Sequence, residues 1–366
     1  MDARALTERL IAYDTSTPEG MSGAAEFIKG WLEARDVEVM SAWHNDRPVL
    51  AATVGAPEGT TVVLHGHLDV VPGHERQFTP RVDGDRLIGR GAYDMKGGLA
   101  AMMLATHELA GQQQVRVHFV CVSDEESDDP MDRGSDYLVE HGYRGDFAIT
   151  GEPTDMHIGV QAKGVLAMRI EVTGKSAHGS TPWLGDNAVL KAFDVLRQME
   201  SLPWARQSSD LFDRPSINLG RILGGDALNK VPDLCVIDVD VRYLPGQDPD
   251  EIRAAVDALP DTRIVKTFHR QPAMVAHDNP YVRVLADAIE EGTSADLISV
   301  GRDGASDVVS FLEAGVPAVE FGPVGAGHHG PDEWVSISSL ERYRRALTEF
   351  VRQVPKRLSR GHLRIA

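Results

Sequence analysis

Histidines and carboxylates directly follow four apolar stretches of this sequence, at points where β-strands would end. The stretches are VVL, VHFVCV, FAIT and AVEF, and the polar side chains after them include His65, His67, Asp69, Glu125, Glu126, Glu152 and His329. Open α/β sheets place their ligand sites beyond the carboxyl ends of the strands. We therefore expect four separate strands to deliver these side chains to one edge of a sheet.

Each of these groups also has an ordinary structural interpretation. A histidine at a strand end can be hydrogen-bonded without binding a metal, and Glu152 can be a turn residue. Asp94, in GRGAYDMKGG, can cap the helix expected to begin near Gly97. Glu125 and Glu126 can belong to a solvated acidic turn, although two adjacent carboxylates at the end of an apolar strand repel each other unless a cation or a proton lies between them.

Taken together, the groups offer two or three imidazoles and three or four carboxylates, without a thiolate. Mixed imidazole and carboxylate ligation suits Zn²⁺, with Co²⁺ or Mn²⁺ as substitutes. The ligands are too many for one tetrahedral ion and fit a pair of ions, which typically lie about 3.5–4 Å apart. Such a pair activates water near neutral pH and polarises a carbonyl group, which is the chemistry of a hydrolase.

The elements that must position these groups alternate between helix and strand over the first 160 residues, and this rhythm returns after Pro272. The expected helices are 22–34, 97–110, 280–291, 305–314 and 338–353, and the expected strands are 60–67, 115–122, 147–150, 296–300 and 317–321. Strands separated by helices predict a parallel sheet covered on both faces.

Residues 163–273 follow a different pattern, in which apolar and polar residues alternate along the strands. The expected order is β-α-β-β-α-β, with strands at 165–172, 216–222, 234–243 and 262–268 and helices at 186–200 and 249–258. Alternation predicts an antiparallel sheet with one face on a core. The sequence thus predicts an α/β fold: a catalytic domain (1–162 and 274–366) with a mixed, mostly parallel sheet, interrupted by an inserted ferredoxin-like dimerisation and lid domain (163–273).

Bulk composition excludes several classes of protein. The 366 residues are 42 % hydrophobic and 25 % charged, which is typical of a globular chain of about two domains. The formal net charge of -18 disfavours binding to nucleic acid or to an anionic membrane. No apolar run approaches the ~20 residues that a membrane helix needs, and the first residues do not resemble a signal peptide.

The chain has two cysteines, Cys121 and Cys235, and both lie in apolar strand-like runs. Two such residues cannot form a disulfide framework, and we interpret each as a small buried hydrophobic side chain. A reducing compartment fits this usage, so the sequence predicts a cytoplasmic protein.

In their order along the chain, HGHLDVVP, GRGAYDMKGG, SDEES, GEPT and HHGPDE resemble the motifs of the M20 metallopeptidases. This family includes acetylornithine deacetylase, succinyl-diaminopimelate desuccinylase, aminoacylase-1 and carboxypeptidase G2. The resemblance covers nearly the whole chain, including the inserted domain. It implies two zinc ions, with Asp94 bridging them and a cis peptide bond from Asp94 to Met95.

The resemblance also implies roles for the other residues of the motifs. Glu125 would be the general base, and Asp69 would orient His67. The remaining ligands would be His67 and Glu152 on the first ion and Glu126 and His329 on the second. His65 and His328 fall one step off the pattern and are not expected to bind metal.

In the inserted domain, GKSAHGSTP resembles a segment whose histidine, here His178, reaches the active site of a neighbouring subunit and helps to stabilise the tetrahedral oxyanion. Asn229 in LNKVP and Arg242 in DVRYLP resemble groups that hold the substrate carboxylate, a task that suits the two-pronged guanidinium of arginine. On the residues alone, Arg242 also fits a solvent-facing strand position. The resemblance therefore implies a homodimer formed through the inserted domain.

Two stretches depart from the family pattern, and one is the acidic SDEESDDPMDRGS, which is longer than expected after the glutamate pair. GRDGASD stands where relatives often have Gly/Thr-Ser-Asp, and its Arg302, Asp303 and Ser306 are candidates for tuning the acyl or side-chain pocket. Both departures leave the expected chemistry unchanged and bear on the identity of the substrate.

The resemblance implies a di-zinc amidohydrolase that cleaves the amide bond of a small N-acyl amino acid with a free carboxylate. A metallo-carboxypeptidase or dipeptidase of the same family is the alternative, and a non-catalytic metal- or peptide-binding homologue is an alternative of another class. The HGHLD segment also has the His-x-His-x-Asp spacing of metallo-β-lactamases, but that motif continues with histidine where this chain has Val70.

Overall fold

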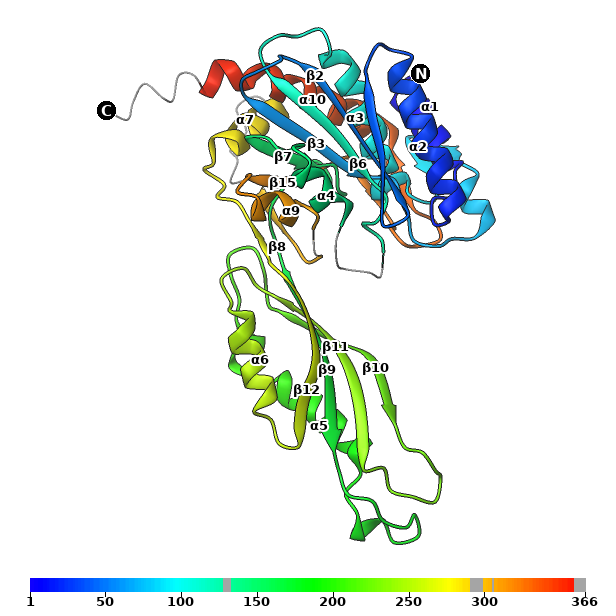
Figure 1. Ribbon diagram of the computed structural model, residues 1–366, viewed down its shortest axis with the longest axis vertical. Coiled ribbons are helices and arrows are strands. Elements are labelled where there is room, and N and C mark those ends of the chain that lie inside the picture. Colours follow the sequence, from blue (N-terminus) through cyan, green and yellow to red (C-terminus); the bar gives the residue numbers. More distant parts are fainter. Residues whose placement is uncertain (128–132, 290–298, 305, 359–366) are drawn as a thin grey trace, which may run out of the picture. The chain divides into compact units, whose positions relative to one another are not determined.

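The computed structural model describes residues 1–127, 133–289, 299–304 and 306–358 (Figure 1). The chain divides into two compact units. The first unit contains Met1–Val160, Val275–Val300 and Asp307–Ala366, and the second contains Gln161–Met274 and Gly301–Ser306. The inserted domain was expected at 163–273, so the second unit also takes in a short segment from much later in the chain.

The large sheet of the first unit has a parallel centre and antiparallel flanks. Its strand order is β1-β2-β6-β3-β7-β15-β8. The strands are β1 (Val39–His44), β2 (Arg47–Gly55), β3 (Thr61–His67), β6 (Arg116–Val122), β7 (Phe147–Thr150), β8 (Ile158–Ala162) and β15 (Ala318–Phe321). β3 pairs in parallel with β6 and β7, and β15 pairs in parallel with β7. The β1–β2 hairpin and the β15–β8 pair are antiparallel, which confirms the predicted α/β class with a mixed sheet.

Helices cover both faces of this sheet, as the side-chain contacts of β3 show. Successive side chains of a strand point to opposite faces. His65 contacts Ser135 of α4 (Gly134–Glu140) and Phe311 of α9 (Val308–Glu313). A Cβ on the next residue, Gly66, would lie only 2.6 Å from Met95 Cε and 3.2 Å from Leu99 Cδ1. The α4–α9 pair therefore covers one face and α3 (Gly97–Leu109) the other.

The remaining helices of the first unit are α1 (Ala3–Ile11), α2 (Pro18–Glu33), α7 (Pro280–Ile289) and α10 (Ile337–Leu358). α2 begins four residues before the expected start at 22, because Thr17 accepts a hydrogen bond from the Gly20 N–H and Pro18 occupies the first turn. The expected strand at 296–300 and the expected helix at 305–314 fall partly outside the described residues; β14 (Ser299–Arg302) and α9 are what the structure describes there.

A second, smaller sheet of the first unit was not expected from the sequence. Its order is β16-β17-β5-β4, with β4 (Arg81–Asp83), β5 (Arg86–Ile88), β16 (Gly325–Ala326) and β17 (Trp334–Ser336). Trp334 of β17 pairs with Ile88 of β5. This pairing brings the segment that leads into Asp94 beside the segment that follows His329.

The second unit has the predicted β-α-β-β-α-β order. Its elements are β9 (Gly164–Thr173), α5 (Ala188–Met199), β10 (Ser216–Gly224), β11 (Leu234–Tyr243), α6 (Pro249–Asp257) and β12 (Thr262–Arg270). The sheet order is β10-β11-β9-β12, and every pair is antiparallel. A short strand, β13 (Ala273–Met274), pairs with the end of β8.

The alternation in the second unit separates a core face from an outer face. Leu166, Met168, Ile170 and Val172 of β9 and their counterparts on β11 are buried in one core. On the outer face, both oxygens of Asp238 accept hydrogen bonds from Arg169, at 2.7 and 2.8 Å. The period-two pattern of the sequence therefore corresponds to a sheet with helices on one side.

None of the helices among the described residues combines the length and the apolar character needed to cross a lipid bilayer.

Candidate metal centre

The imidazole of His67 is buried at the end of β3, and its two nitrogens face different groups. Nε2 lies 3.2 Å from Asp94 Oδ1 and 3.6 Å from Glu152 Oε1. Glu152 follows β7, the parallel neighbour of β3. The carboxyl ends of adjacent parallel strands thus bring a histidine and a carboxylate together, as the sequence predicted.

Asp69 contacts the His67 ring with its carboxylate, as expected, and also with its backbone carbonyl. Nδ1 of His67 lies 3.0 Å from the backbone carbonyl oxygen of Asp69 and 3.5 Å from its carboxylate Oδ1. The other carboxylate oxygen accepts a 2.9 Å hydrogen bond from the Glu126 N–H. Asp69 therefore fixes the imidazole through its main chain as well as its side chain, and it also fixes the backbone of Glu126.

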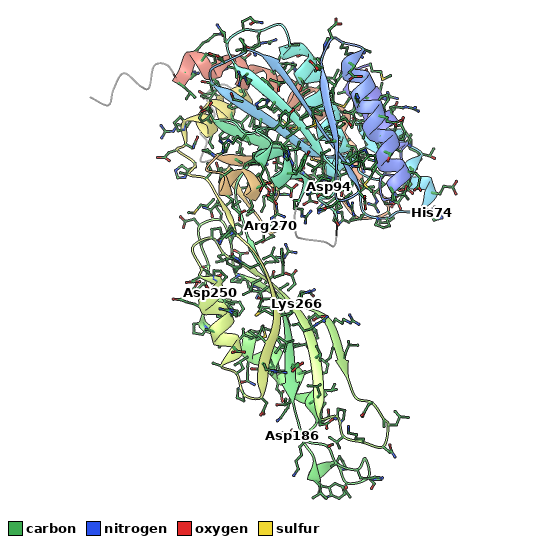
Figure 2. The ribbon with its side chains drawn as sticks, viewed as in Figure 1. His74, Asp94, Asp186, Asp250, Lys266 and Arg270 are labelled. Atoms are coloured by element: carbon green, nitrogen blue, oxygen red, sulfur yellow. The ribbon has the colours of Figure 1, made fainter. Side chains whose placement is uncertain are left out.

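Asp94 lies between two histidines, at the lower edge of the first unit in Figure 2. Its Oδ1 faces His67, and its Oδ2 lies 3.4 Å from Nε2 of His329. The residue belongs to an irregular turn, Ala92–Lys96, directly before α3. The Asp94–Met95 peptide bond is cis, as the motif predicted.

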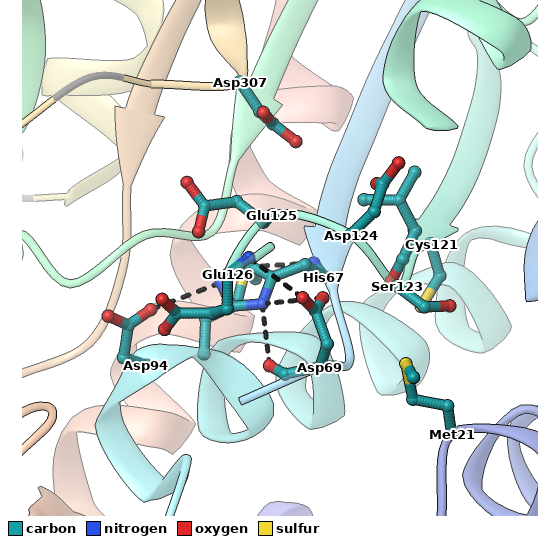
Figure 3. Close-up of polar contacts among 12 residues, drawn as sticks. Met21, His67, Asp69, Asp94, Cys121, Ser123, Asp124, Glu125, Glu126 and Asp307 are labelled. Carbon is teal, nitrogen blue, oxygen red and sulfur yellow. Dashed lines mark hydrogen bonds and ion pairs between the residues drawn. The ribbon is translucent and has the colours of Figure 1, made fainter. Parts of the chain in front are cut away.

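Two groups of candidate ligand atoms therefore share Asp94. His67, Asp94 and Glu152 form one, and Asp94, Glu126 and His329 form the other. In the second group, Nε2 of His329 lies 2.8 Å from Glu126 Oε1. Within each group the ligand atoms lie within 4.8 Å of one another. Figure 3 shows His67, Asp94, Glu126 and Asp69 converging from separate parts of the ribbon.

The electrostatics of the cluster fit a cation. Burial by itself lowers the pKa of His67, but hydrogen bonds to Asp69 and Asp94 and the charge of Glu152 raise it well above its ordinary value. Hydrogen bonds to Asp94 and Glu126 raise the pKa of His329 to about 10. Among the protein's own groups, the carboxylates thus draw protons onto both imidazoles, and a divalent ion would supply the same positive charge.

Two further observations support a cation at this place. Burial raises the pKa of Glu152 well above its ordinary value, with Asp94 and Glu125 adding to the effect and His67 opposing it. Glu152 Oε1 is buried and, within the described part of the chain, has no hydrogen-bond partner. A buried oxygen without a hydrogen-bond partner, close to the His67 imidazole and the Asp94 carboxylate, has a lone pair that can bind a metal.

Glu125 lies beside this cluster without belonging to either group. Burial raises its pKa to about 8; the positive charge of His67 opposes the rise, and Asp307, Asp94 and Glu126 add to it. Figure 3 shows its carboxylate between Asp307 and the ligand cluster. A carboxylate with a raised pKa, next to candidate metal ligands, can accept a proton from water and return it.

The backbone around Glu125 is fixed by residues that the sequence did not single out. Arg133 Nη1 donates to the carbonyl oxygens of Asp124 and Glu125, the second at 2.7 Å. The Gly134 N–H donates to the Asp124 carboxylate at 2.7 Å. In the sequence Arg133 follows an acidic stretch and has no distinguishing spacing, so its contacts with Asp124 and Glu125 could not be predicted.

His65 and His328, which were not expected to be ligands, lie in other surroundings. Nε2 of His65 lies 2.9 Å from Ser135 Oγ, which in turn donates to Asp307 Oδ2 at 2.8 Å. The ring of His328 lies 6.0 Å from the ring of Tyr93. Asp307 belongs to the GRDGASD motif, and its part in this buried chain of hydrogen bonds was not predicted.

The predicted substrate-binding residues of the second unit lie in two separate places. The Gly179 N–H donates to the Asn229 carbonyl oxygen at 2.7 Å, so Asn229 and the exposed His178 belong to neighbouring loops. Arg242 lies one residue before the far end of β11, and its Nε donates to Asp240 at 3.0 Å. Since β11 starts at Leu234, its length separates that start from Arg242 by roughly 26 Å.

The departing motif GRDGASD is anchored within the second unit by Lys163. The ammonium group of Lys163 lies 2.7 Å from Asp303 Oδ1, and the backbone N–H of Lys163 donates to the Arg302 carbonyl oxygen at 3.1 Å. Ser306 is buried. Lys163 thus holds Arg302 and Asp303, Ser306 belongs to the same unit, and the effect of the three residues on a substrate pocket stays a prediction.

Residues 63–353 match the family model described as peptidase family M20/M25/M40. The chain belongs to this family. It is accordingly a metal-dependent hydrolase that acts on amide bonds, and the paired ligand groups are its candidate metal centre.

Among similar proteins, a succinyl-diaminopimelate desuccinylase from Leptothrix cholodnii is 31 % identical over 93 % of this chain and 97 % of its own. An acetylornithine deacetylase from Vibrio atlanticus is 28 % identical over 95 % of both chains. The solved structure of an M20 family metallo-carboxypeptidase from Sulfolobus solfataricus has a TM-score of 0.77 at 17 % identity, covering 97 % of this chain and all of that one. That last likeness shows a common fold.

The two adjacent histidines of the M20 motif HHGPDE allow a matched test of the ligand assignment. Both are exposed, so replacing either should leave the fold intact. His329→Ala should weaken the binding of one ion by more than the roughly 10–100-fold that the loss of an outer-shell partner typically costs.

His328→Ala should bind metal like the unmodified chain, because His328 belongs to neither ligand group. Titration of the metal-stripped protein with Co²⁺ measures both affinities. Equal loss in the two variants would contradict the assignment.

Proposed function

We propose that this chain is a di-zinc amidohydrolase that removes the acyl group from a small N-acyl amino acid. The observation that carries the proposal is the sharing of Asp94 by two ligand groups, with Glu125 directly beside them. The donor set of imidazoles and carboxylates suits Zn²⁺, and it accepts Co²⁺ or Mn²⁺.

His67, Asp94, Glu126, Glu152 and His329 would hold the ions, whose chemistry when bound would be to make water more acidic and to polarise an amide carbonyl. In the proposed reaction, Glu125 accepts a proton from a water molecule while the oxygen of that water attacks the carbonyl carbon. The C–N bond then breaks, and Glu125 delivers that proton to the departing amine. The raised pKa of Glu125, about 8, suits a group that takes up and releases a proton near neutral pH.

The other residues of the proposal bind and orient the substrate. Arg242 and Asn229 would hold the free carboxylate, and His178 would donate a hydrogen bond to the carbonyl oxygen as negative charge develops on it. Since Asn229 lies in the loop before β11 and Arg242 lies near the far end of that strand, we propose that they come from different subunits. His178 and Asn229, on neighbouring loops, would then enter the partner's site together.

Exposed apolar side chains on the second unit support a homodimer. Leu190 and Phe193 lie one turn apart on α5 and are 63 % and 44 % exposed. Leu223 is half exposed on β10, which is an edge strand. Exposed apolar groups beside an unpaired strand edge favour pairing with another chain, and a second copy of this chain brings the same surface.

The desuccinylase and deacetylase relatives, similar over nearly their whole length, favour an N-acyl amino acid as the substrate. A metallo-carboxypeptidase or dipeptidase is the second candidate, because a metallo-carboxypeptidase shares the fold over its whole chain. We also propose a cytoplasmic location, since both cysteines are buried free thiols.

A substrate panel tests the proposed reaction. N-acetyl amino acids, N-succinyl amino acids and dipeptides would each be incubated with the protein and Zn²⁺ or Co²⁺, with and without a chelator. We expect hydrolysis of an N-acyl amino acid that chelation abolishes and added metal restores. Hydrolysis of dipeptides alone would favour the second candidate, and no hydrolysis by the metal-loaded protein would contradict both.

The role of Glu125 gives a sharper prediction. Glu125→Gln keeps the shape of the side chain but cannot accept a proton, so kcat should fall by about 10²–10⁴-fold. The metal content should not change, because Glu125 belongs to neither ligand group. Glu140→Gln, at an exposed position of α4, is the control and should keep full turnover. Unchanged turnover in Glu125→Gln would refute its role as the base.

The role across the dimer is tested by mixing two inactive chains. A dimer with one Glu125→Gln chain and one His178→Ala chain, purified through two affinity tags, would hold one intact site. We expect about half of the wild-type turnover per dimer, because each two-fold related interface places one subunit's residues in the other's site. A mixed dimer as inactive as its parents would contradict the contribution of His178 to the partner.

A further inference from the structure

A buried carboxylate holds the backbone around the shared ligand Asp94. Glu333 is 1 % exposed. Its Oε1 accepts hydrogen bonds from the backbone N–H groups of Tyr93 and Asp94, both at 3.0 Å. Its Oε2 accepts from the Gly91 N–H at 3.0 Å. One side chain therefore satisfies three backbone donors of the turn that presents Asp94.

The same carboxylate is paired with an arginine that also reaches the backbone of another candidate ligand, His329. Arg90 is 3 % exposed, and its Nη1 donates to Glu333 Oε2 at 2.9 Å. Its Nη2 donates to the backbone carbonyl oxygen of His329 at 3.2 Å. The ion pair thus connects the main chain at Asp94 to the main chain at His329.

The small sheet of the first unit carries both halves of this ion pair. Arg90 follows β5 and Glu333 precedes β17, and the two strands pair directly. The Gly89 N–H also donates to the Glu333 carbonyl oxygen at 3.0 Å. The segments that present Asp94 and His329 therefore leave one small sheet side by side.

A carboxylate at this position has an electrostatic cost. It lies near Asp94, in a region that already contains several other buried acids, and a buried ion pair is often no more stabilising than apolar packing of the same volume. Stability alone therefore gives a weak reason for Glu333. Glu333 accepts hydrogen bonds from the backbone of the candidate ligand Asp94 and of residues just before it, which points to a role in the geometry of the site.

We propose that the Arg90–Glu333 ion pair is the positioning device of the metal centre, holding Asp94 and His329 at the separation that metal binding requires. The proposal rests on the proposed two-metal function. Glu333 acts on Asp94, which both ligand groups share. Arg90 acts through its second hydrogen bond on His329, which belongs to one group.

Two conservative substitutions separate these effects. The carboxylate of Glu333 meets donors on both oxygens, whereas an amide has one oxygen and would face a pair of donors with its own NH₂ group. Glu333→Gln should therefore release the turn at Asp94. Arg90→Lys keeps a positive charge for Glu333, but a single ammonium group cannot also reach the His329 carbonyl in the forked geometry of a guanidinium.

The experiment titrates the metal-stripped full chain with Co²⁺ in competition with a chelator of known affinity, which gives a Kd for each ion. Glu333→Gln should raise both Kd values by about 10–100-fold. Arg90→Lys should raise one Kd by a similar factor and leave the other within about threefold. Added to His329→Ala, Arg90→Lys should have little further effect, because both changes act on the same ligand.

Asp85→Asn is the matched control. The carboxylate of Asp85 accepts hydrogen bonds from the Ser338 N–H at 2.8 Å and the Ser336 hydroxyl at 2.6 Å, at the other end of the same strand pair, and it belongs to neither ligand group. This variant should lower the melting temperature and leave both Kd values unchanged.

Several results would overturn the proposal. One is a folded Glu333→Gln variant with wild-type Kd values, and another is an equal rise in Kd caused by Asp85→Asn. If Glu333→Gln does not fold, Arg90→Lys decides: wild-type Kd values in that variant refute the positioning role. A wild-type chain that binds two ions while these variants also bind them normally leaves the proposed function standing. A wild-type chain that binds no Co²⁺ overturns both.

Discussion

The repulsion among closely placed carboxylates that are buried or partly buried is the constraint on which this structure depends. Asp94, Glu126 and Glu152 converge on two histidines at the end of the first unit, and Glu125 lies beside them. So much negative charge away from water is unfavourable unless cations or protons balance it. The pKa of His67 and of His329 rises in response. Under the proposed function, stability and catalysis would be coupled at this place, because a cation that relieved the repulsion would also supply the chemistry that activates water.

The fold meets this constraint by building the site from rigid elements and holding each ligand through its backbone. Parallel β3 and β7 deliver His67 and Glu152 from their carboxyl ends. Asp69 holds both the His67 ring and the Glu126 N–H. The small sheet supplies Glu333, which holds the turn at Asp94. The geometry of the site then depends on hydrogen bonds to the main chain. These hold the ligands more rigidly than a surface cluster of long, flexible side chains would.

Features with a local signal were predicted from the sequence, and features made by distant pairing were not. The apolar run of β3 and the alternation of β9 and β11 identified the sheets, because burial leaves a periodic trace in the sequence. The convergence of His67, Glu126 and Glu152 could be predicted because each lies at or just after the end of a strand, whereas the role expected of Asp94 came from the resemblance of its motif. The three-residue strands β5 and β17 have no such trace, so the Arg90–Glu333 pair, 243 positions apart, could not be found. Arg133 was missed for a different reason: it lies only eight positions from Glu125, but it follows an acidic stretch and has no distinguishing spacing.

The most direct test of the account is an anomalous-diffraction map of crystals grown with Zn²⁺ or Co²⁺. The account predicts two peaks about 3.5–4 Å apart on either side of the Asp94 carboxylate. One would be bound by His67 and Glu152, and the other by Glu126 and His329. A single peak that leaves one of these groups without metal, or peaks remote from Asp94, would contradict it.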